Sequence, residues 1–427
     1  MQFPRLLLVR QKFPDHAIPD IAAEVQKQLA AADFAGRVKP NARIAIGAGS
    51  RGIHNLAEIV RNVVRYWKDA GMRPFIFPAM GSHGAATAAG QADVLAHYGV
   101  TEAAMGCPIV SQLDVISLGK TADGIEVFLD KAASEADAIM PVNRVKWHTD
   151  FSGAIESGLF KMMAIGMGKL AGAKRYHTHA YTMGMEKVIT SAGRLVLQTG
   201  KILGGLAILE DANHNTGKLD AIPAAEIEQR EREDLALVKS WMAKIPMDLD
   251  ILVVDEMGKN ISGTCMDTKV INRTVHGAYN PWPDTAKIRR IFVRELSADS
   301  YGNALGIGMA DIATDRLVSA VDWAATAVNV LTSGSLGGAH APLHYATDRE
   351  CLERVTPTVG KFDPAEVTFG WVRNSLELAR LALSENLRAE IERDPSLVIE
   401  AETEFTFDRA GDLLSPFAQV EEAAAVR

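Results

Sequence analysis

The stretch ARIAIGAGSRGIHNLAEIVRNVVRYWKDAGMRPFIFPAM, residues 42–80, decides the fold class of this chain. Its two ends, 42–49 and 73–80, are short apolar runs of the length typical of buried strands. Between them, apolar residues recur at the spacing of one helix face, and Gly71 fits a helix stop. The pattern predicts strand, helix and strand in succession, which is the building unit of a parallel sheet.

The same alternation extends along the rest of the chain, and a new strand at 250–258 follows Ile245-Pro246-Met247. We therefore place a domain boundary there. We predict an α/β protein with two domains, each with a mostly parallel sheet flanked by helices, and an active site in the cleft between them. The N-terminal, cofactor-binding domain is expected over 1–246 and the C-terminal domain over 247–395, and packing of the tail 396–427 against the N-terminal domain is left open.

Composition excludes several classes of protein. The chain has 427 residues and a net charge of −8, without the basic character of a nucleic-acid binder. No stretch approaches the roughly 20 apolar residues that span a bilayer. The three cysteines, Cys107, Cys265 and Cys351, lie far apart in the sequence and the start does not resemble a secretory signal. We expect a cytoplasmic protein that binds neither nucleic acid nor membrane.

Two loops that follow predicted strands carry residue types suited to binding and proton transfer. GAGSRGIHN, 47–55, opens a helix, where an anion is favoured, and Arg51 suits a carboxylate or phosphate. Its glycines do not form the GxGxxG dinucleotide fingerprint, so a glycine-rich turn with a surface arginine is an equal interpretation. In GSHGAAT, 81–87, His83 suits acid–base work because histidines titrate near neutrality. The alternative is a helix-capping Ser or Thr beside a bystander histidine.

The segment 143–180 is the richest in chemistry-bearing residues, which are His148, Lys161, Lys169, His177 and His179. Lys161 interrupts an apolar helical run, and a lysine there either reaches water or is buried for a purpose. His177 and His179 form an HxH pair that suits a metal ion. The alternative is a glycine-rich helix packed tightly on the sheet, but the clustering of titratable groups favours function.

The order of an arginine loop, a histidine loop and a histidine–lysine–histidine segment resembles the lactate racemase family, over nearly the whole chain. Members carry a tethered nickel-pincer nucleotide, of the pyridinium-3,5-bisthiocarboxylic acid mononucleotide type. The resemblance implies that Lys161 holds this cofactor covalently and that His177, sixteen residues later, binds nickel, with His179 in reserve. It further implies His83 and His148 as the acid–base pair. Arg51 and, by a loose match in DEMGKNISG, Lys259 are the implied substrate-binding residues.

Departures from the family pattern concern the substrate side. The first motif is DHTR-like in the family and Ala48-Gly49-Ser50-Arg51 here, and the family's THR is Ser82-His83-Gly84 here. The gap from His148 to Lys161 is three residues longer than in lactate racemase itself. We therefore expect a racemase or epimerase of a different, larger 2-hydroxy acid. The cofactor-making enzymes are expected partners, and a homodimer is left open.

The resemblance agrees with elementary chemistry. The C2 hydrogen of a 2-hydroxy acid is a very weak acid, so removal as hydride is easier than removal as a proton, and only a cofactor accepts hydride. Two histidines on opposite sides then serve as base for the two enantiomers. Three other hypotheses stay open: a dehydrogenase with a free dinucleotide, a non-catalytic binding homologue, and a zinc hydrolase using His177 and His179, which lacks an HExxH motif.

Overall fold

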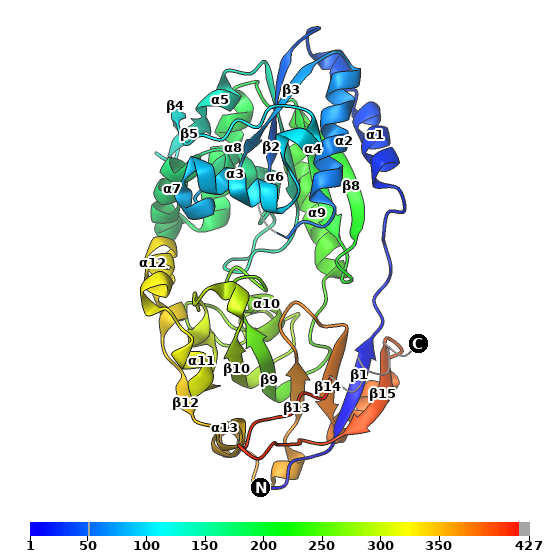
Figure 1. Ribbon diagram of the computed structural model, residues 1–427, viewed down its shortest axis with the longest axis vertical. Helices are drawn as coiled ribbons and strands as arrows, with labels where there is room; N and C mark the ends of the chain where they lie inside the picture. The colour runs from blue at the N-terminus through cyan, green and yellow to red at the C-terminus, as the bar shows by residue number, and fades with distance from the viewer. Residues whose placement is uncertain (50–51, 418–427) are drawn as a thin grey trace. The chain divides into compact units, whose positions relative to one another are not determined.

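The computed structural model describes residues 1–49 and 52–417, and the chain divides into two compact units (Figure 1). The first unit is Pro14–Met242, and the second joins Met1–Phe13 to Ala243–Arg427. Each unit holds a mixed sheet with a parallel core and flanking helices, so the predicted α/β fold class is confirmed. Among the helices of the described ranges, none combines the length and the apolar character needed to cross a bilayer.

The first unit is built on a five-stranded sheet in the order β3-β2-β6-β7-β8. Its first four strands are parallel and β8 is antiparallel to β7. The bounds are β2 Arg43–Ala48, β3 Arg73–Pro78, β6 Ala138–Arg144, β7 Gly204–Glu210 and β8 Thr216–Pro223, with a separate hairpin of β4 Val115–Lys120 and β5 Glu126–Asp130. The predicted strands at 42–49 and 73–80 are confirmed as β2 and β3.

Helices cover both faces of this sheet. Strand β2 shows why, because Ala45 joins one hydrophobic core while Ile44 and Ile46 join the other. The helices are α1 Ile21–Ala32, α2 Leu56–Asp69, α3 Ala88–His97, α4 Glu102–Met105, α5 Lys131–Ser134, α6 Leu159–Lys161, α7 Lys169–Met183, α8 Met185–Gln198 and α9 Ile227–Trp241. The helix predicted within 42–80 is confirmed as α2, which buries its apolar stripe.

The order of the strands creates a switch point between β2 and β6. From β2 the chain moves to β3 on one side, and it later returns to form β6 on the other side of β2. In open parallel sheets, ligands bind beyond the carboxyl ends of the strands at such a point. We call the carboxyl ends of β3, β2 and β6, with the loops that follow them, the switch-point edge.

The second unit holds an eight-stranded sheet in the order β12-β11-β10-β9-β13-β14-β1-β15. The first five strands are parallel and the last three are added antiparallel. The strands are β1 Leu6–Gln11, β9 Leu249–Met257, β10 Ile288–Leu296, β11 Ile312–Thr314, β12 Leu343–Tyr345, β13 Phe369–Val372, β14 Arg380–Ser384 and β15 Leu397–Thr403. The helices are α10 Thr268–Ile271, α11 Asp315–Ser319, α12 Trp323–Ser333, α13 Asp348–Val355 and α14 Arg388–Arg393.

The first strand differs from its predicted place. The sequence pattern assigned residues 1–246 to one domain, whereas β1 lies between β14 and β15 in the second unit. Strand β15, in the tail 396–427, pairs with β1, so this part of the tail belongs to the sheet of the second unit. A short apolar run specifies a strand but not its partner, because pairing depends on residues hundreds of positions away.

The sequence pattern predicts helices over 155–167, 311–332 and 364–393, and all three predictions are wrong in extent. The segment Ile155–Met167 becomes helical only at α6, and the stretch Asp311–Thr332 is β11, α11 and α12. Residues 364–393 contain β13 and β14 before α14 begins. Short apolar runs cannot separate a buried strand from a helix by periodicity alone, and Thr314 and Asp322 start new helices by capping them.

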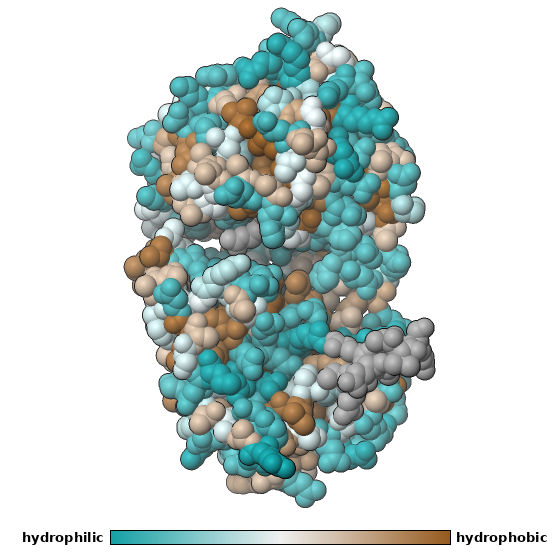
Figure 2. Space-filling model, viewed as in Figure 1, coloured by the Kyte–Doolittle hydropathy of each residue, from teal (hydrophilic) through white to brown (hydrophobic). Residues whose placement is uncertain are grey.

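Helix α12 departs from the usual pattern in which apolar side chains of a helix face the core and polar ones face water. Its buried residues are Thr326 and Val330, while Val328 and Leu331 are exposed. Figure 2 shows hydrophobic atoms gathered over this helix on a face that elsewhere mixes polar and apolar residues. Apolar side chains of this helix therefore lie on its exposed surface as well as on its buried side.

The place of β1 makes a testable prediction. Leu6 is fully buried in the core of the second unit. Leu6→Ala should lower the free energy of unfolding of that unit by about 2–5 kcal/mol, because it leaves a cavity in the sheet. Hydrogen–deuterium exchange should rise in β9 and β14 and stay unchanged in β2 and β6. The reverse distribution would place the first strand with the first unit.

Candidate functional site

The loop after β2 begins packed against the end of β6. A Cβ atom on Gly49 would lie 2.5 Å from Asn143 Oδ1, so a glycine is needed at this close approach. Arg144, at the end of β6, donates to the Gly52 carbonyl at 2.7 Å and pairs with Glu210. The predicted substrate-binding Arg51 lies outside the described residues. Arg144, which the sequence analysis did not single out, thus places a cation beside this loop.

The loop after β3, Ala79–Thr87, which we call the histidine loop, lies against the segment that follows Lys161. The Gly81 N–H donates to the Gly166 carbonyl at 3.1 Å, and Gly81 has a positive φ of 62°. His83 is half-buried and precedes a turn of 3₁₀-helix. Thr87 caps α3 through the Gly90 N–H, so the capping alternative is correct for this threonine. The capping does not account for His83.

The loop after β6 holds His148. Its Nδ1 accepts from the Asp150 N–H at 3.0 Å, and its ring stacks on Phe151 with centroids 4.4 Å apart. With Nδ1 accepting, a neutral ring carries its proton on Nε2 and acts as a donor. His148 therefore offers a hydrogen-bond donor at Nε2 in this arrangement, and transfer of a proton at Nε2 requires release of the Asp150 N–H.

A buried carboxylate holds this loop in shape. Glu156 is fully buried and accepts from the backbone N–H groups of His148 and Gly153, the second at 3.1 Å. Lys239 of α9 donates to the same carboxylate at 2.5 Å. Several donors on one ionised acceptor give short, strong bonds, so Glu156 fixes the backbone position of His148.

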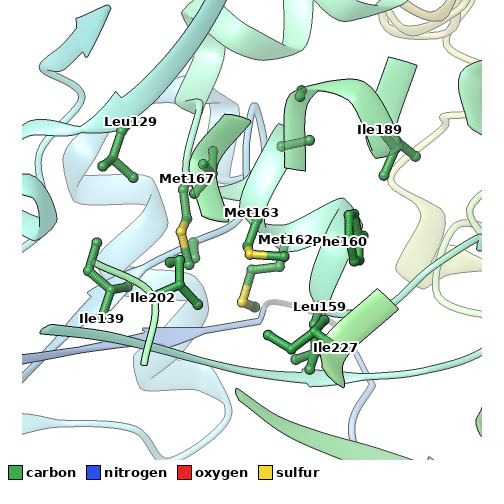
Figure 3. Packing of buried hydrophobic residues seen from close by; sticks show 14 of the residues in the cluster. Leu129, Ile139, Leu159, Phe160, Met162, Met163, Met167, Ile189, Ile202 and Ile227 are labelled. Atoms are coloured by element: carbon green, nitrogen blue, oxygen red, sulfur yellow. The ribbon is translucent and has the colours of Figure 1, made fainter. Parts of the chain in front are cut away.

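Lys161 is the polar residue of a stretch that otherwise belongs to the core. Its neighbours Phe160, Met162 and Met163 are buried and pack in one cluster (Figure 3). Lys161 itself is half-buried at the end of α6, and a π-helical turn, Met162–Gly166, follows at once. Such turns occur often at functional sites, because they re-aim a side chain without ending the helix.

His177 lies on α7 in the electrostatic field of Lys161. Burial lowers the pKa of His177 below its ordinary value, the positive charge of Lys161 lowers it further, and Asp150 raises it. The charges of Lys161 and Asp150 therefore lie close to the imidazole. His179 is about 200° further round the same helix, so the two histidines of the HxH pair cannot face one ion together.

Helix α6 begins on a buried carboxyl group that the sequence analysis overlooked. Glu231 of α9 is fully buried and accepts from the Phe160 N–H at 2.9 Å, and a side chain at Gly158 would collide with it. Burial raises the pKa of Glu231 to about 8. A signal existed, since Glu231 is four residues from Ile227 and from Leu235 on the apolar face of α9.

The lysine predicted in the second unit does not extend freely from its loop. Lys259 Nζ donates to the Gly263 carbonyl at 2.6 Å within the same loop. Lys269 of α10 follows in the chain, is nearly fully buried, and places its ammonium 4.8 Å from the centroid of the Trp282 ring. Both lysines follow β9, and Lys269 was not singled out from the sequence.

The side chains around Lys161 suit a metal held mainly by an organic group better than a metal ion held by protein ligands alone. Among the residues that the structure describes, no three His, Cys, Asp or Glu side chains gather to hold a metal ion by themselves. A zinc hydrolase needs about three protein ligands, so that hypothesis has no support in the described part. A metal held mainly by an organic group needs fewer protein ligands, and an amine could attach such a group while a neutral imidazole completes the coordination. Lys161 and His177, with its lowered pKa, fit that requirement.

Comparisons with known proteins give two similarities. Residues 37–226 match the family model described as a domain of unknown function, DUF362. Among solved structures, the lactate racemase apoprotein from Thermoanaerobacterium thermosaccharolyticum is 14% identical, with a TM-score of 0.45, over 69% of this chain and 75% of that one. No curated protein matches the sequence. At this identity and TM-score, the likeness does not decide the activity of the present chain.

The raised pKa of Glu231 predicts a pH dependence of stability. A folded pKa of about 8, against 4.5 in an accessible carboxyl, means that its contribution is present below pH 4.5 and is lost as the pH rises to 8. Glu231→Gln keeps an acceptor for Phe160 and should remove this loss. Chemical denaturation should show the variant gaining on the parent by about 5 kcal/mol between these limits, at about 1.4 kcal/mol per pH unit.

Glu233→Gln is the matched control, because Glu233 is exposed on the same helix. Its unfolding free energy should follow that of the parent chain at every pH. Parallel curves for Glu231→Gln and the parent chain would show that Glu231 is ionised in the folded protein.

Proposed function

We propose that this chain is a racemase or epimerase of a 2-hydroxy acid that acts by reversible hydride transfer. The proposed cofactor is a nickel-pincer nucleotide, of the pyridinium-3,5-bisthiocarboxylic acid mononucleotide type, attached to Lys161. The observation that carries the proposal is the proximity of Lys161 and His177, on successive helical segments of the first unit, where the lysine charge acts on the imidazole. The location of both His83 and His148 in loops of the switch-point edge supports it.

Two residues would hold the cofactor. The Lys161 amine would form the covalent link, and the His177 imidazole would ligate nickel. Burial keeps His177 neutral to a lower pH than an exposed histidine, and only the neutral imidazole offers a lone pair to a metal. When bound, the group supplies the hydride acceptor that protein side chains lack.

The histidines would move the proton of the substrate hydroxyl. As the alcohol becomes a ketone, one histidine takes that proton, and as hydride returns to the other face, a histidine gives one back. For His148 to take and return a proton at Nε2, its Nδ1 would first have to release the Asp150 N–H. Atoms and electrons balance over the cycle, because one hydride and one proton leave and return.

Binding of the substrate is assigned to cations. Arg51 is proposed to clamp the carboxylate and so aim C2, and Lys259 is proposed as a second substrate contact. Lys259 would first have to leave the Gly263 carbonyl. The altered motifs around Arg51 and His83 favour a 2-hydroxy acid larger than lactate.

Intact-protein mass spectrometry with nickel analysis tests the cofactor. The chain made together with cofactor-making enzymes should carry a covalent adduct and about one nickel. Lys161→Ala should lose both, because the attachment amine is gone. His177→Ala should keep the adduct and lose most of the nickel, since the metal loses its imidazole.

Two neighbours provide matched controls. Lys174→Ala, at an exposed position of α7, should keep adduct and nickel, and so should His179→Ala on another side of that helix. An unmodified, nickel-free parent chain under these conditions would remove the cofactor from the proposal. Release of NAD on denaturation would favour the dehydrogenase alternative.

Removal of either proposed acid–base residue should stop racemisation. His83→Ala and His148→Ala should each lower kcat by about 10²–10⁴-fold on the best 2-hydroxy acid of a panel, because proton transfer loses its positioned partner. Chiral chromatography measures the rate, and the adduct on Lys161 should persist. His97→Ala, at an exposed position of α3, should keep the parent activity. Full activity in His83→Ala or His148→Ala would exclude that histidine from the mechanism.

A further inference from the structure

A second lysine of the same segment is buried far more deeply than Lys161. Lys169, the first residue of α7, is fully buried together with Asp130, and their charged atoms lie 3.2 Å apart. Its ammonium also donates to the Pro78 carbonyl at 2.5 Å and to Gln91 Oε1 at 3.2 Å. Two hydrogen bonds and one ion pair together determine the position of this ammonium.

Gln91 extends this contact to the histidine loop. The Gln91 side chain is fully buried, and its Nε2 donates to the Gly81 carbonyl at 2.8 Å and towards the His83 carbonyl at 3.4 Å. Gln91 thus receives from Lys169 at one end of its amide and donates to the loop at the other. The backbone of His83 is connected through Gln91 to the start of the helix that carries His177.

The backbone conformation and the burial of Lys169 are both energetically unfavourable, and a purely stabilising role does not explain them. Lys169 has a φ of 52°, a left-handed conformation that side chains other than glycine, asparagine and aspartate seldom adopt. Its charge and that of Asp130 are also removed from water, and buried ion pairs rarely stabilise more than apolar residues of the same volume. Backbone strain combined with a buried charge is more typical of a site whose geometry matters.

We propose that Lys169 is a positioning residue, whose buried ammonium acts through Gln91 to set where His83 lies relative to the segment of Lys161 and His177. The inference rests on the proposed function, because it assumes that His83 exchanges a proton with substrate. Lys169 touches neither substrate nor cofactor in this role. Its contacts link the end of β3, the end of β5 and helix α3 to the start of α7.

Gln91→Met tests the connection without leaving a charge unpaired, since Lys169 keeps Asp130 and Pro78. Histidine-selective ¹H–¹³C NMR should show the ring signal of His83, identified by its loss in His83→Gln, shifted and broadened. Hydrogen exchange should rise over 81–87. On the loaded enzyme, kcat should fall by about 10–100-fold while KM changes less than about twofold, because a misplacement near 1 Å costs on this order.

Lys169→Met alone leaves Asp130 as an unpaired buried carboxylate, and this variant is expected to fold poorly. Lys169→Met combined with Asp130→Asn removes both charges and should recover most of the Tm. The double variant should still show the altered His83 signal and the lowered kcat. Lys174→Met, exposed on α7, is the control and should match the parent chain in every measurement.

A double variant that recovers the parent Tm, the parent His83 signal and the parent kcat would overturn the inference, because Lys169 would then only neutralise Asp130. An unchanged His83 signal in Gln91→Met would overturn it as well. The NMR and exchange measurements need no cofactor. The absence of an adduct on Lys161 would therefore count against the proposed function and not against the positioning role.

Discussion

The parallel pairing of β3, β2 and β6 is the constraint on which the first unit depends. Because all three strands run the same way, their following loops emerge at one edge of the sheet. The chain forms β3 on one side of β2 and β6 on the other, so the connections that follow β2 and β6 leave in opposite directions. The first residues of these two loops therefore lie side by side. Gly49 touching Asn143 is the direct sign of this meeting.

Buried polar groups then give these loops their shape. Glu156 holds the His148 backbone, Glu231 starts the helix of Lys161, and Gln91 holds the loop of His83. Each acts on backbone groups that lie outside regular sheet and helix bonding, which must find partners when they are buried. The chemistry-bearing side chains are thus left half-buried and accessible, while the supporting side chains are removed from water.

The two histidines and the lysine of the proposed site differ in how they are supported. His148 is held by its own ring bond and by stacking on Phe151. His83 is held through its backbone, and Lys161 by the core on both sides of it.

Local pattern predicted much of the first unit, including β2, α2 and β3, because each has a clear period and a clear stop. It predicted the second unit less well. The chain over 364–393 was expected to be helical and forms β13 and β14, since short buried strands lack alternation. The supporting residues Gln91 and Glu156 carried no isolated signal, because a polar residue on a helix or loop is ordinarily exposed. Glu231 did carry one, since it lies on the apolar face of α9.

By itself, the sequence determined the α/β class, the order of strands and helices in 42–80, and the segment that holds His148, Lys161 and His177. These follow from periodicity and residue type, which are local. Only the tertiary structure decided that β1 belongs with the second unit, that the charge of Lys161 acts on His177, and that Lys169 is the fully buried lysine of the segment 143–180. Strand pairing, burial and electrostatic proximity join residues distant in the chain, and no local pattern contains them.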